Sequence, residues 1–279
     1  MSPPKTCPAC VILTKNEELT LGQSLASVAW CSERVVVDSG STDQTRELAE
    51  STGARFLVHV QAGNFNIAEQ RNWALESAGI QSEWILFLDA DEEVTPALRV
   101  AIERELAAPG GFNAYELTPR YLFWGKWLKR TQGFPNWHPR MVKRGHAWFT
   151  GGVWEHFDSR AIIGRIEEPY NHYANSKGLS DWLARHDRYS TWDAQKIVAY
   201  LETRDPKALG TERKATLRLC AAQFYPLRPF ARFLHIYLLR MGFLEGIPAL
   251  VFSYQYFVYE TFTVIKVWEL KRKNRLQSL

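Results

Sequence analysis

The first hundred or so residues alternate between short apolar runs and longer segments in which apolar residues recur every three or four positions. The runs are rich in Val, Ile, Leu and Phe, as buried strands are, and they lie at residues 9–14, 34–38, 54–59 and 84–89. The segments that follow them have the period of helices that bury one face. This alternation predicts an α/β fold with a mostly parallel sheet and helices on both of its faces.

Residues that favour helix ends stand between these runs. Asn, Asp and Thr favour helix N-caps, Pro favours the first helical turn, and Gly favours the position after a helix. The candidate N-terminal residues are Thr42-Asp43, Asn66 and Thr95-Pro96, and the candidate C-terminal residues are Gly53 and Gly79. These signals support a helix after each predicted strand.

Four carboxylates, Asp89, Asp91, Glu92 and Glu93, follow the fourth run within five residues. Ligands of parallel sheets bind outside the carboxyl ends of the strands, and Asp38 ends the second run in the same way. In an extended backbone the carboxylates of Asp89 and Asp91 point the same way, about 6–7 Å apart. They repel each other unless a cation binds, and Mg²⁺ or Mn²⁺, completed by phosphates and water, suits such oxygen ligands.

A second interpretation of these acids needs no metal. Acids before the helix that begins at Thr95-Pro96 favour its positive end, which explains Glu92 and Glu93 but not Asp89. The chain contains neither G-x-G-x-x-G after a strand nor G-x-x-x-x-G-K-[ST], so these two glycine-rich phosphate-binding motifs are excluded. A nucleoside diphosphate bound at this edge would therefore need a metal ion to neutralise its charge.

Charge and cysteine content narrow the class of protein further. The formal net charge of +4 is too small to indicate nucleic-acid binding. The four cysteines do not make a disulfide framework. The first ten residues lack the basic and apolar regions of a signal peptide, so we expect reduced thiols and a cytoplasmic location.

Several motifs resemble those of family 2 glycosyltransferases with the GT-A fold: TKNEE (14–18), VVVDSGSTDQT (35–45), AEQRNWAL (68–75) and LFLDADEE (86–93). Later segments resemble the subgroup that contains lipopolysaccharide-core β-glucosyltransferases: FWGKWLKR (123–130), HPRMVKRG (138–145), GGVWEHF (151–157) and NHY (171–173). The resemblance implies inverting, metal-dependent transfer of a single sugar from a nucleotide sugar, with UDP as the expected nucleotide. The implied acceptor is a glycan or lipid-linked molecule of cell-envelope polysaccharide biosynthesis.

The resemblance also implies roles for individual residues. The implied nucleotide-sugar-binding residues are Thr14, Asn16, Glu17, Asp38, Arg71 and Asp89, and the implied metal ligands are Asp91, Asp89 and His172. Asp91 is the expected direct ligand of the metal, and Asp89 is expected nearer the ribose. On helical spacing alone, Arg71 would instead form a surface ion pair with Glu69 or Glu76.

Inversion requires a carboxylate on the face of the sugar opposite the leaving group, where it takes a proton from the acceptor. The resemblance points to Glu155 as this catalytic base, because it matches the acid of the subgroup's His-Glu pair. This chain has Trp154 in place of the usual His, and His156 follows the acid. The alternatives are an exposed loop acid for Glu155 and a structural histidine for His172.

The remainder of the chain is rich in aromatic residues. A basic aromatic segment is expected to bind the acceptor through Trp124, Trp127, Trp137, Lys126, Lys129, Arg130 and Arg140. Apolar residues from Phe230 to Leu244 recur at helical steps, and basic residues gather between Lys266 and Arg275. We expect a catalytic domain at residues 1–205 and a region of amphipathic helices at 206–279 that binds the cytoplasmic face of a membrane, or else packs in a dimer.

Two other functions are compatible with parts of this pattern. A sugar nucleotidylyltransferase would need a glycine-rich, arginine-containing loop after the first strand, where this chain has KNEEL (15–19). A non-catalytic, membrane-associated sugar-binding protein would not need Asp89, Asp91 and Glu155 together. Turnover of a nucleotide sugar separates the three functions.

Overall fold

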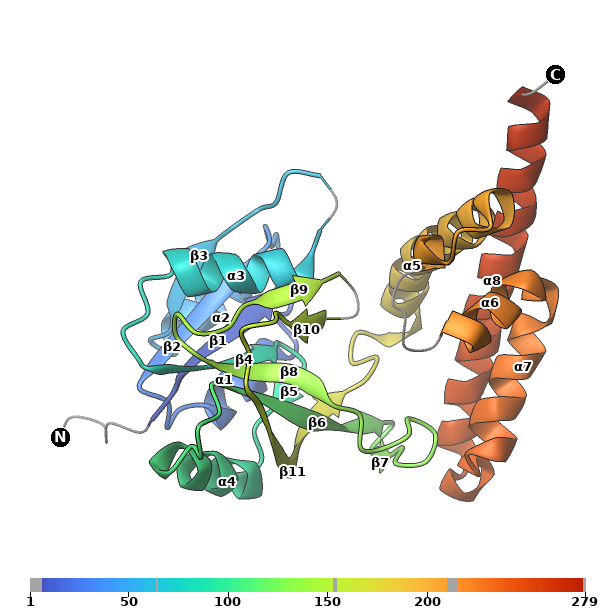
Figure 1. Cartoon of the computed structure of the whole chain (residues 1–279). Coiled ribbons are helices and arrows are strands. Elements are labelled where there is room, and N and C mark those ends of the chain that lie inside the picture. Colours follow the sequence, from blue (N-terminus) through green and yellow to red (C-terminus); the bar gives the residue numbers. More distant parts are fainter. Residues whose placement is uncertain (1–6, 64, 153–154, 210–214, 278–279) are drawn as a thin grey trace. The chain divides into compact units, whose positions relative to one another are not determined.

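Figure 1 shows the computed structural model of the chain, which describes residues 7–63, 65–152, 155–209 and 215–277. The contacts divide the chain into two units. The first comprises Met1–Leu122 and Phe134–Ser176, and the second comprises Phe123–Gly133 and Lys177–Leu279. Helix α5, Gly178–Thr203, lies in the second unit, although the expected domain boundary after residue 205 assigns it to the catalytic domain.

The four predicted strands are present and pair in parallel, in the order β3-β2-β1-β4. They are β1 Ala9–Thr14, β2 Glu33–Asp38, β3 Arg55–Val58 and β4 Trp84–Asp89. The sheet continues through strands that the apolar pattern did not reveal: β8 His138–Lys143, β6 Ala114–Phe123, β11 Ile163–Tyr173 and β5 Glu92–Glu93. Three of these junctions, β4–β8, β8–β6 and β11–β5, are antiparallel, and β6–β11 is parallel. Three short strands complete the set: β7 Lys126–Trp127, β9 Phe149–Gly151 and β10 Glu155–Phe157.

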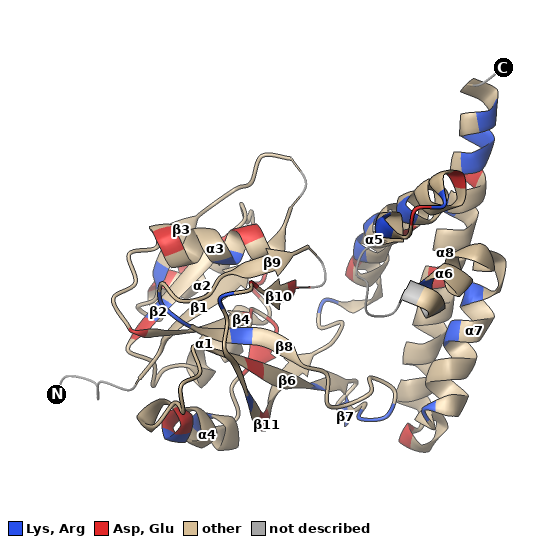
Figure 2. Cartoon of the chain, in the orientation of Figure 1, with Lys and Arg blue, Asp and Glu red and all other residues tan. Residues whose placement is uncertain are grey.

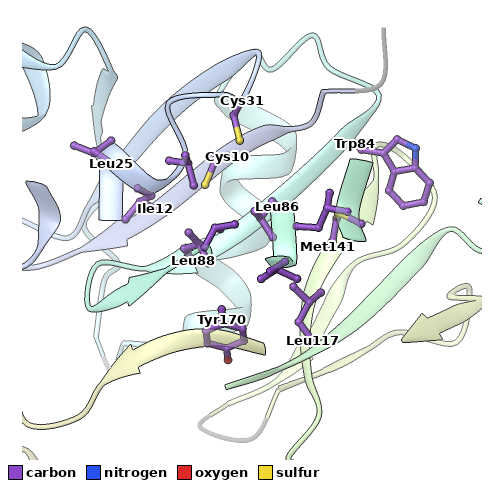
Figure 3. Close-up of a cluster of buried hydrophobic side chains, with 14 of the residues drawn as sticks. Cys10, Ile12, Leu25, Cys31, Trp84, Leu86, Leu88, Leu117, Met141 and Tyr170 are labelled. Atoms are coloured by element: carbon purple, nitrogen blue, oxygen red, sulfur yellow. The ribbon is translucent and has the colours of Figure 1, made fainter. Parts of the chain in front are cut away.

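Helices cover both faces of this sheet, as the alternation predicts. One face packs against α1 Leu21–Ser27, α2 Thr45–Ser51 and α4 Pro96–Ala107, and Figure 3 shows part of this core around Ile12 and Leu88. The other face packs against α3, Ile67–Ser77, and includes Val11 and Phe87. Neighbouring residues of one strand thus enter opposite cores, as the two-residue period of a strand requires. The predicted α/β class is confirmed.

Two of the predicted N-caps are confirmed by hydrogen bonds. The Asn66 side chain accepts from the N–H groups of Ala68 and Glu69, and the Thr95 hydroxyl accepts from the N–H of Leu98. The third candidate, Thr42-Asp43, lies just before the N-cap position Gln44, and the Asp43 side chain accepts from the N–H of Thr45, the first residue of α2, at 3.1 Å. The parallel register brings the carboxyl ends of the strands together, with Thr14 beside Asp38.

The second unit is helical. Its core joins α5 to the long helix α8, Ile247–Gln277, through Ile197 and Val267, with α6, Ala215–Gln223, and α7, Arg228–Leu234, beside them. The remaining turns of this unit are η1 Pro206–Leu209, η3 Tyr225–Leu227, η4 His235–Leu239 and η5 Gly242–Glu245. In the described residues, no helix has the combination of length and apolarity that crossing a bilayer requires.

The helix predicted by the apolar stripe from Phe230 to Leu244 is interrupted. It runs through α7 and the π-helical turn η4, and Met241 then adopts a left-handed backbone with φ of 56°. Gly242 follows, and a Cβ there would lie 2.8 Å from the carbonyl oxygen of Ile236, so only glycine lets the chain turn back so tightly. Several side chains of the predicted apolar stripe are largely exposed, including Phe230 at 60% and Leu244 at 59%.

Candidate active site

Asp89, at the end of β4, is held by two buried arginines from different elements. Arg71 of α3 donates from Nη2 to Asp89 Oδ1 at 3.1 Å, and Arg140 of β8 donates from Nη2 to Asp89 Oδ2 at 3.2 Å. The exposed fraction is 0% for Arg71 and 3% for Arg140. Both carboxylate oxygens of Asp89 are thus fixed by charge-assisted hydrogen bonds before any ligand binds.

The same two arginines hold two further carboxylates. Arg140 Nη2 lies 2.7 Å from Glu92 Oε1, and Glu92 Oε2 accepts from the Asp89 N–H at 3.0 Å. Glu155 Oε2 lies 3.0 Å from Arg71 Nη1 and 3.6 Å from Arg140 Nη1. We call these five residues, Arg71, Asp89, Glu92, Arg140 and Glu155, the buried ion network. The network thus contains three carboxyl groups and two guanidinium groups.

The pKa values of two carboxyl groups in the network, Glu92 and Glu155, are shifted in opposite directions. Burial alone would raise the pKa of Glu92, but Arg140 and His172 outweigh burial and hold that pKa well below its ordinary range. Burial raises the pKa of Glu155 above its ordinary value, although Arg71 and Arg140 oppose the rise. Among the described residues, Glu155 Oε1 is buried and has no hydrogen-bond partner. The Glu155 carboxyl is therefore the member of the network best prepared to accept a proton.

Asp91 lies outside the network, in the turn between β4 and β5. Its Oδ2 is 3.6 Å from His172 Nε2, while His172 Nδ1 is 3.4 Å from Glu92 Oε1. Burial raises the pKa of Asp91 to about 6. Burial alone would lower the pKa of His172, but Asp91 and Glu92 raise it to about 9. A positive charge close to Asp91 is thus favoured at this position.

A divalent cation fits Asp91 and His172 better than it fits Asp89. Adjacent ligands of an octahedral ion are about 3 Å apart, which is close to the 3.6 Å between Asp91 Oδ2 and His172 Nε2. Asp89 already has both oxygens on arginines. In the described part of the chain, no group of three or more His, Cys, Asp and Glu side chains is arranged to hold a metal ion. The donor set therefore suits an ion that completes its shell with substrate phosphates and water.

The backbone around these acids differs from the one that the spacing argument assumed. Ala90 and Asp91 form a turn instead of continuing the strand, so the expectation of two parallel carboxylates on an extended chain is wrong. The interpretation of Glu92 as a helix-end acid is also wrong, because its side chain is fully buried against Arg140. Asp91 instead lines a pocket of about 190 Å³ together with Thr20, Gln23 and Tyr173.

Thr14 and Asp38, the predicted nucleotide-binding residues at the ends of β1 and β2, are hydrogen-bonded to each other. Asp38 is 2% exposed, and it accepts from the Thr14 hydroxyl and from the N–H groups of Gly40 and Ser41. Asp38 therefore shapes the loop after β2.

Asn16 and Glu17 belong to the loop after β1, which is bonded to the loop after β2. The Asn16 N–H donates to the Ser41 hydroxyl and the Asn16 side chain accepts from the Thr42 N–H, at 2.7 and 2.8 Å. The Glu17 N–H donates to the Thr45 hydroxyl at 2.9 Å. Asn16 has a positive φ of 54°, which asparagine tolerates better than most residues. We call residues 14–18 and 38–45, joined by these bonds, the interlocked loops.

Arg71 differs from both sequence interpretations. It forms no surface ion pair with Glu69 or Glu76, because its guanidinium is enclosed between Asp89, Glu155 and the carbonyl oxygen of Pro139. Full burial also separates it from any ligand in this conformation. Glu155 is likewise not an exposed loop acid, since its side chain is 7% exposed. Trp154 lies outside the described residues.

Arg140 is the site residue that the sequence misassigned. The basic aromatic pattern placed it on the acceptor surface, but it is buried beneath Asp89 and its guanidinium lies 5.5 Å from the Tyr170 ring. Trp137 is the other residue of that pattern in the first unit, and its ring contacts the guanidinium of Arg165. The antiparallel pairing of β8 with β4 brings Arg140 next to Asp89. The apolar pattern does not reveal this pairing, so the sequence contains no sign that Arg140 belongs to the site.

His138 predicts acid sensitivity of the fold. Burial, with Arg140 nearby, lowers its pKa to about 3, and its Nε2 lies 2.9 Å from Asn136 Nδ2. A histidine with a depressed folded-state pKa stabilises the fold above the unfolded pKa, and this contribution is lost as the pH falls from about 6.5 toward 3. Between pH 7.5 and 5 the wild type should lose about 2 kcal/mol more than His138→Gln in denaturant titrations. Equal losses in the two proteins would contradict the prediction.

Comparison with known proteins gives the following similarities. Residues 9–166 match the family model described as Glycosyl transferase family 2. The chain is 37% identical over 202 residues to the lipopolysaccharide core biosynthesis glycosyltransferase LpsC of Rhizobium meliloti, which covers 70% of this chain and 73% of LpsC. It is 38% identical over 93 residues to an uncharacterised glycosyltransferase of Rickettsia typhi, which covers 33% of this chain and 30% of that protein.

Among solved structures, the chain is similar to glucosyl-3-phosphoglycerate synthase of Mycobacterium tuberculosis. In its complex with Mn²⁺, uridine diphosphate and phosphoglyceric acid, the TM-score is 0.44 and the identity 18%, over 64% of this chain and 73% of that chain. In a complex with Mn²⁺, uridine diphosphate and glucosyl-3-phosphoglycerate, the TM-score is 0.38 and the identity 21%, over 50% of this chain and 57% of that chain.

Proposed function

Because this chain belongs to glycosyl transferase family 2, we propose that it transfers a single sugar, with inversion, from a nucleotide sugar to an acceptor of the cell envelope. The observation that carries the proposal is the edge of the sheet where β1, β2 and β4 end. There Asp91 lines a pocket, and the buried ion network holds Asp89 and Glu155 on Arg71. The proposed nucleotide is UDP, and the proposed ion is Mg²⁺ or Mn²⁺.

In this proposal Asp91 and His172 hold the divalent cation. When bound, the ion would stabilise the negative charge that grows on the departing diphosphate. The interlocked loops would bind the nucleoside through their backbone and through Asn16 and Glu17. Asp89, held by Arg71 and Arg140, would offer a fixed carboxylate to the ribose or the sugar. Its fixed position lowers the cost of ordering the site when the donor binds.

The acceptor is proposed to be a glycan or a lipid-linked molecule at the cytoplasmic face of a membrane. Support comes from LpsC, whose name assigns it to lipopolysaccharide core biosynthesis and which shares 37% identity with this chain. Further support is the second unit, whose exposed apolar side chains suit peripheral attachment to lipid.

The test of this function is turnover. Purified full-length protein, incubated with Mn²⁺ and a panel of nucleotide sugars, should release nucleoside diphosphate in the presence of a lipid A–core acceptor extract. Pyrophosphate release from a sugar phosphate and a nucleoside triphosphate would instead indicate a nucleotidylyltransferase. Binding of sugars without turnover of any donor would indicate a non-catalytic protein.

Glu155 is proposed as the catalytic base, and its replacement tests that role. Burial raises its pKa, and one of its oxygens has no hydrogen-bond partner among the residues that the structure describes, which suits a group that accepts a proton from an acceptor hydroxyl. Glu155→Gln should lower kcat by about 10²-fold or more, while the KM of the donor changes little. Steady-state kinetics with donor and acceptor varied in turn would measure both constants.

A structural role for Glu155 gives a different result. If its carboxylate only neutralises Arg71, Glu155→Gln should lower the melting temperature while kcat at a permissive temperature stays within about threefold of wild type. A matched control is Glu116→Gln, which removes a carboxylate from an exposed ion pair with Arg165 in the same unit. That variant should leave both quantities near the wild-type values.

A further inference from the structure

The loop Phe123–Gly133, which the sequence pattern assigns to acceptor binding, is built into the helical unit. Glu245 of η5 fastens it. Its Oε1 accepts from the Arg130 N–H at 2.6 Å, and its Oε2 accepts from the Thr131 N–H at 2.9 Å and from the Thr131 hydroxyl. Arg240 adds a bond from Nη1 to the Thr131 carbonyl oxygen at 3.4 Å. Loop and turn therefore form one surface.

The charge of this surface is of one sign. Residues 123–133 and 224–259 contain Lys126, Lys129, Arg130, Arg228, Arg232 and Arg240 but only one acid, Glu245. Glu245 is 7% exposed and already bonded to the loop, while Arg228 pairs with Glu260. Burial, and then Arg240 and Arg232, lower the pKa of His235 between them, as expected where cations gather. Figure 2 shows the blue segments of the β7 loop and of α7.

Large apolar side chains are exposed beside these cations. The exposed fractions are 67% for Trp124 in the loop, 76% for Leu239 in η4 and 59% for Leu244 in η5. Trp124 stacks on Phe123 at 5.0 Å, and Phe123 packs against Phe252 of α8 at 5.5 Å. The loop thus presents its tryptophan from a rigid base. We call Trp124, Lys126, Lys129, Arg130, Leu239, Arg240 and Leu244 the cationic apolar surface.

We propose that the cationic apolar surface docks on the anionic phospholipid surface of a membrane, with the loop 123–133 as its main contact. Lys126, Lys129 and Arg130 would bind headgroup phosphates, and Trp124, Leu239 and Leu244 would enter the interface between headgroups and acyl chains. The inference rests on the proposed function only for its purpose, which is to bring the enzyme to a lipid-linked acceptor.

Other occupants fit these side chains less well. A glycan acceptor offers hydroxyl groups and no partner for exposed leucines. A second copy of the chain would bring the same patch against itself in a two-fold dimer, so Lys and Arg would face Lys and Arg without an exposed acid between them. An anionic lipid surface offers negative headgroups to the Lys and Arg side chains of the cationic apolar surface. It also offers an apolar layer to its Trp and Leu side chains.

Vesicle flotation of the full-length protein tests the proposal. The wild type should float with vesicles of phosphatidylcholine and phosphatidylglycerol at low salt, and should float less at high salt or with phosphatidylcholine alone. Lys126→Glu/Lys129→Glu/Arg130→Glu should lower vesicle affinity by about 100-fold or more. Arg188→Glu/Lys196→Glu/Lys207→Glu, with the same change in net charge elsewhere on the unit, should retain most of the affinity.

A second variant tests the apolar part. Leu239→Ser/Leu244→Ser should weaken vesicle binding about tenfold or more without removing its salt dependence. The proposal is overturned if the wild type ignores anionic vesicles, if both charge variants lose binding equally, or if light scattering shows that the loop variant only dissociates a dimer.

The outcome is separable from that of the proposed function. Calorimetric binding of UDP with Mn²⁺ should be the same in the wild type and in all three variants, because their substitutions lie in the second unit. Vesicle binding without nucleotide binding would leave the docking surface standing and reject the glycosyl transfer. Nucleotide binding and turnover without vesicle binding would support the glycosyl transfer and reject the docking surface.

Discussion

Asp91→Asn should reduce turnover of a nucleotide sugar by about 10³-fold or more, because a divalent ion contributes several kcal/mol to stabilising the departing diphosphate. Asp91 lines the pocket beside α1, and its Oδ2 lies 3.6 Å from His172 Nε2. Asparagine has nearly the same shape but removes the charge that attracts the cation. Calorimetry should show that Mn²⁺ no longer strengthens binding of a nucleoside diphosphate.

The loss of binding should not come from unfolding. Asparagine removes a negative charge from the neighbourhood of Asp89 and Glu92, so the melting temperature should not fall. Glu103→Gln is a matched control, since it neutralises an exposed acid on α4 that pairs with Arg99, and it should keep wild-type activity. Unchanged Mn²⁺-dependent binding in Asp91→Asn would remove Asp91 from the proposed metal site.

Arg140→Met should cost about 3–5 kcal/mol of unfolding free energy, because it leaves buried carboxylates without their cation. Arg140 lies within 3.2 Å of both Asp89 and Glu92, and the Glu92 side chain is fully buried. The surface pair of Arg165 with Glu116 provides the comparison. Arg165→Met should change the unfolding free energy by about 1 kcal/mol or less, because exposed ion pairs contribute little.

A double variant separates loss of charge pairing from loss of packing. In Arg140→Met/Glu92→Gln the buried negative charge is removed along with its partner, so the protein should be more stable than Arg140→Met alone. Urea titrations of the four proteins in this cycle measure the coupling. If the double variant is as unstable as the sum of the single variants, the network stabilises the fold through packing rather than through charge.

The sequence predicts the first half of the fold because each local signal there agrees with the next. Apolar runs, N-caps at Asn66 and Thr95, and strand–helix alternation all specify the same parallel sheet. Thr42-Asp43 has a second role that the local pattern does not reveal. The Asp43 carboxylate accepts from the N–H of Thr45 in α2, as predicted, but also from the N–H of Glu18, and the Thr42 N–H donates to Asn16.

The candidate site was less predictable, because its charges are paired through tertiary contacts. The sequence predicts a nucleotide contact or a surface ion pair for Arg71 and an acceptor contact for Arg140, because arginines are seldom fully buried unless paired. Their partners come from β4, β5 and β10, and the antiparallel strands that deliver Arg140 have no clear apolar alternation. Asp91 could be singled out from its position after β4, while the turn that separates it from Asp89 could not.

The interlocked loops bear on how relatives of this chain can exchange parts. Asn16 and Ser41 are 25 positions apart, yet the backbone of each loop is completed by groups from the other. A laboratory chimera that takes residues 14–18 from a relative and keeps residues 38–45 would leave N–H groups of one loop facing side chains that evolved for another partner. The two loops are separate in sequence but depend on each other structurally, so substitutions in one constrain the residues that the other can have. Attempts to change donor preference by recombination should move both segments together.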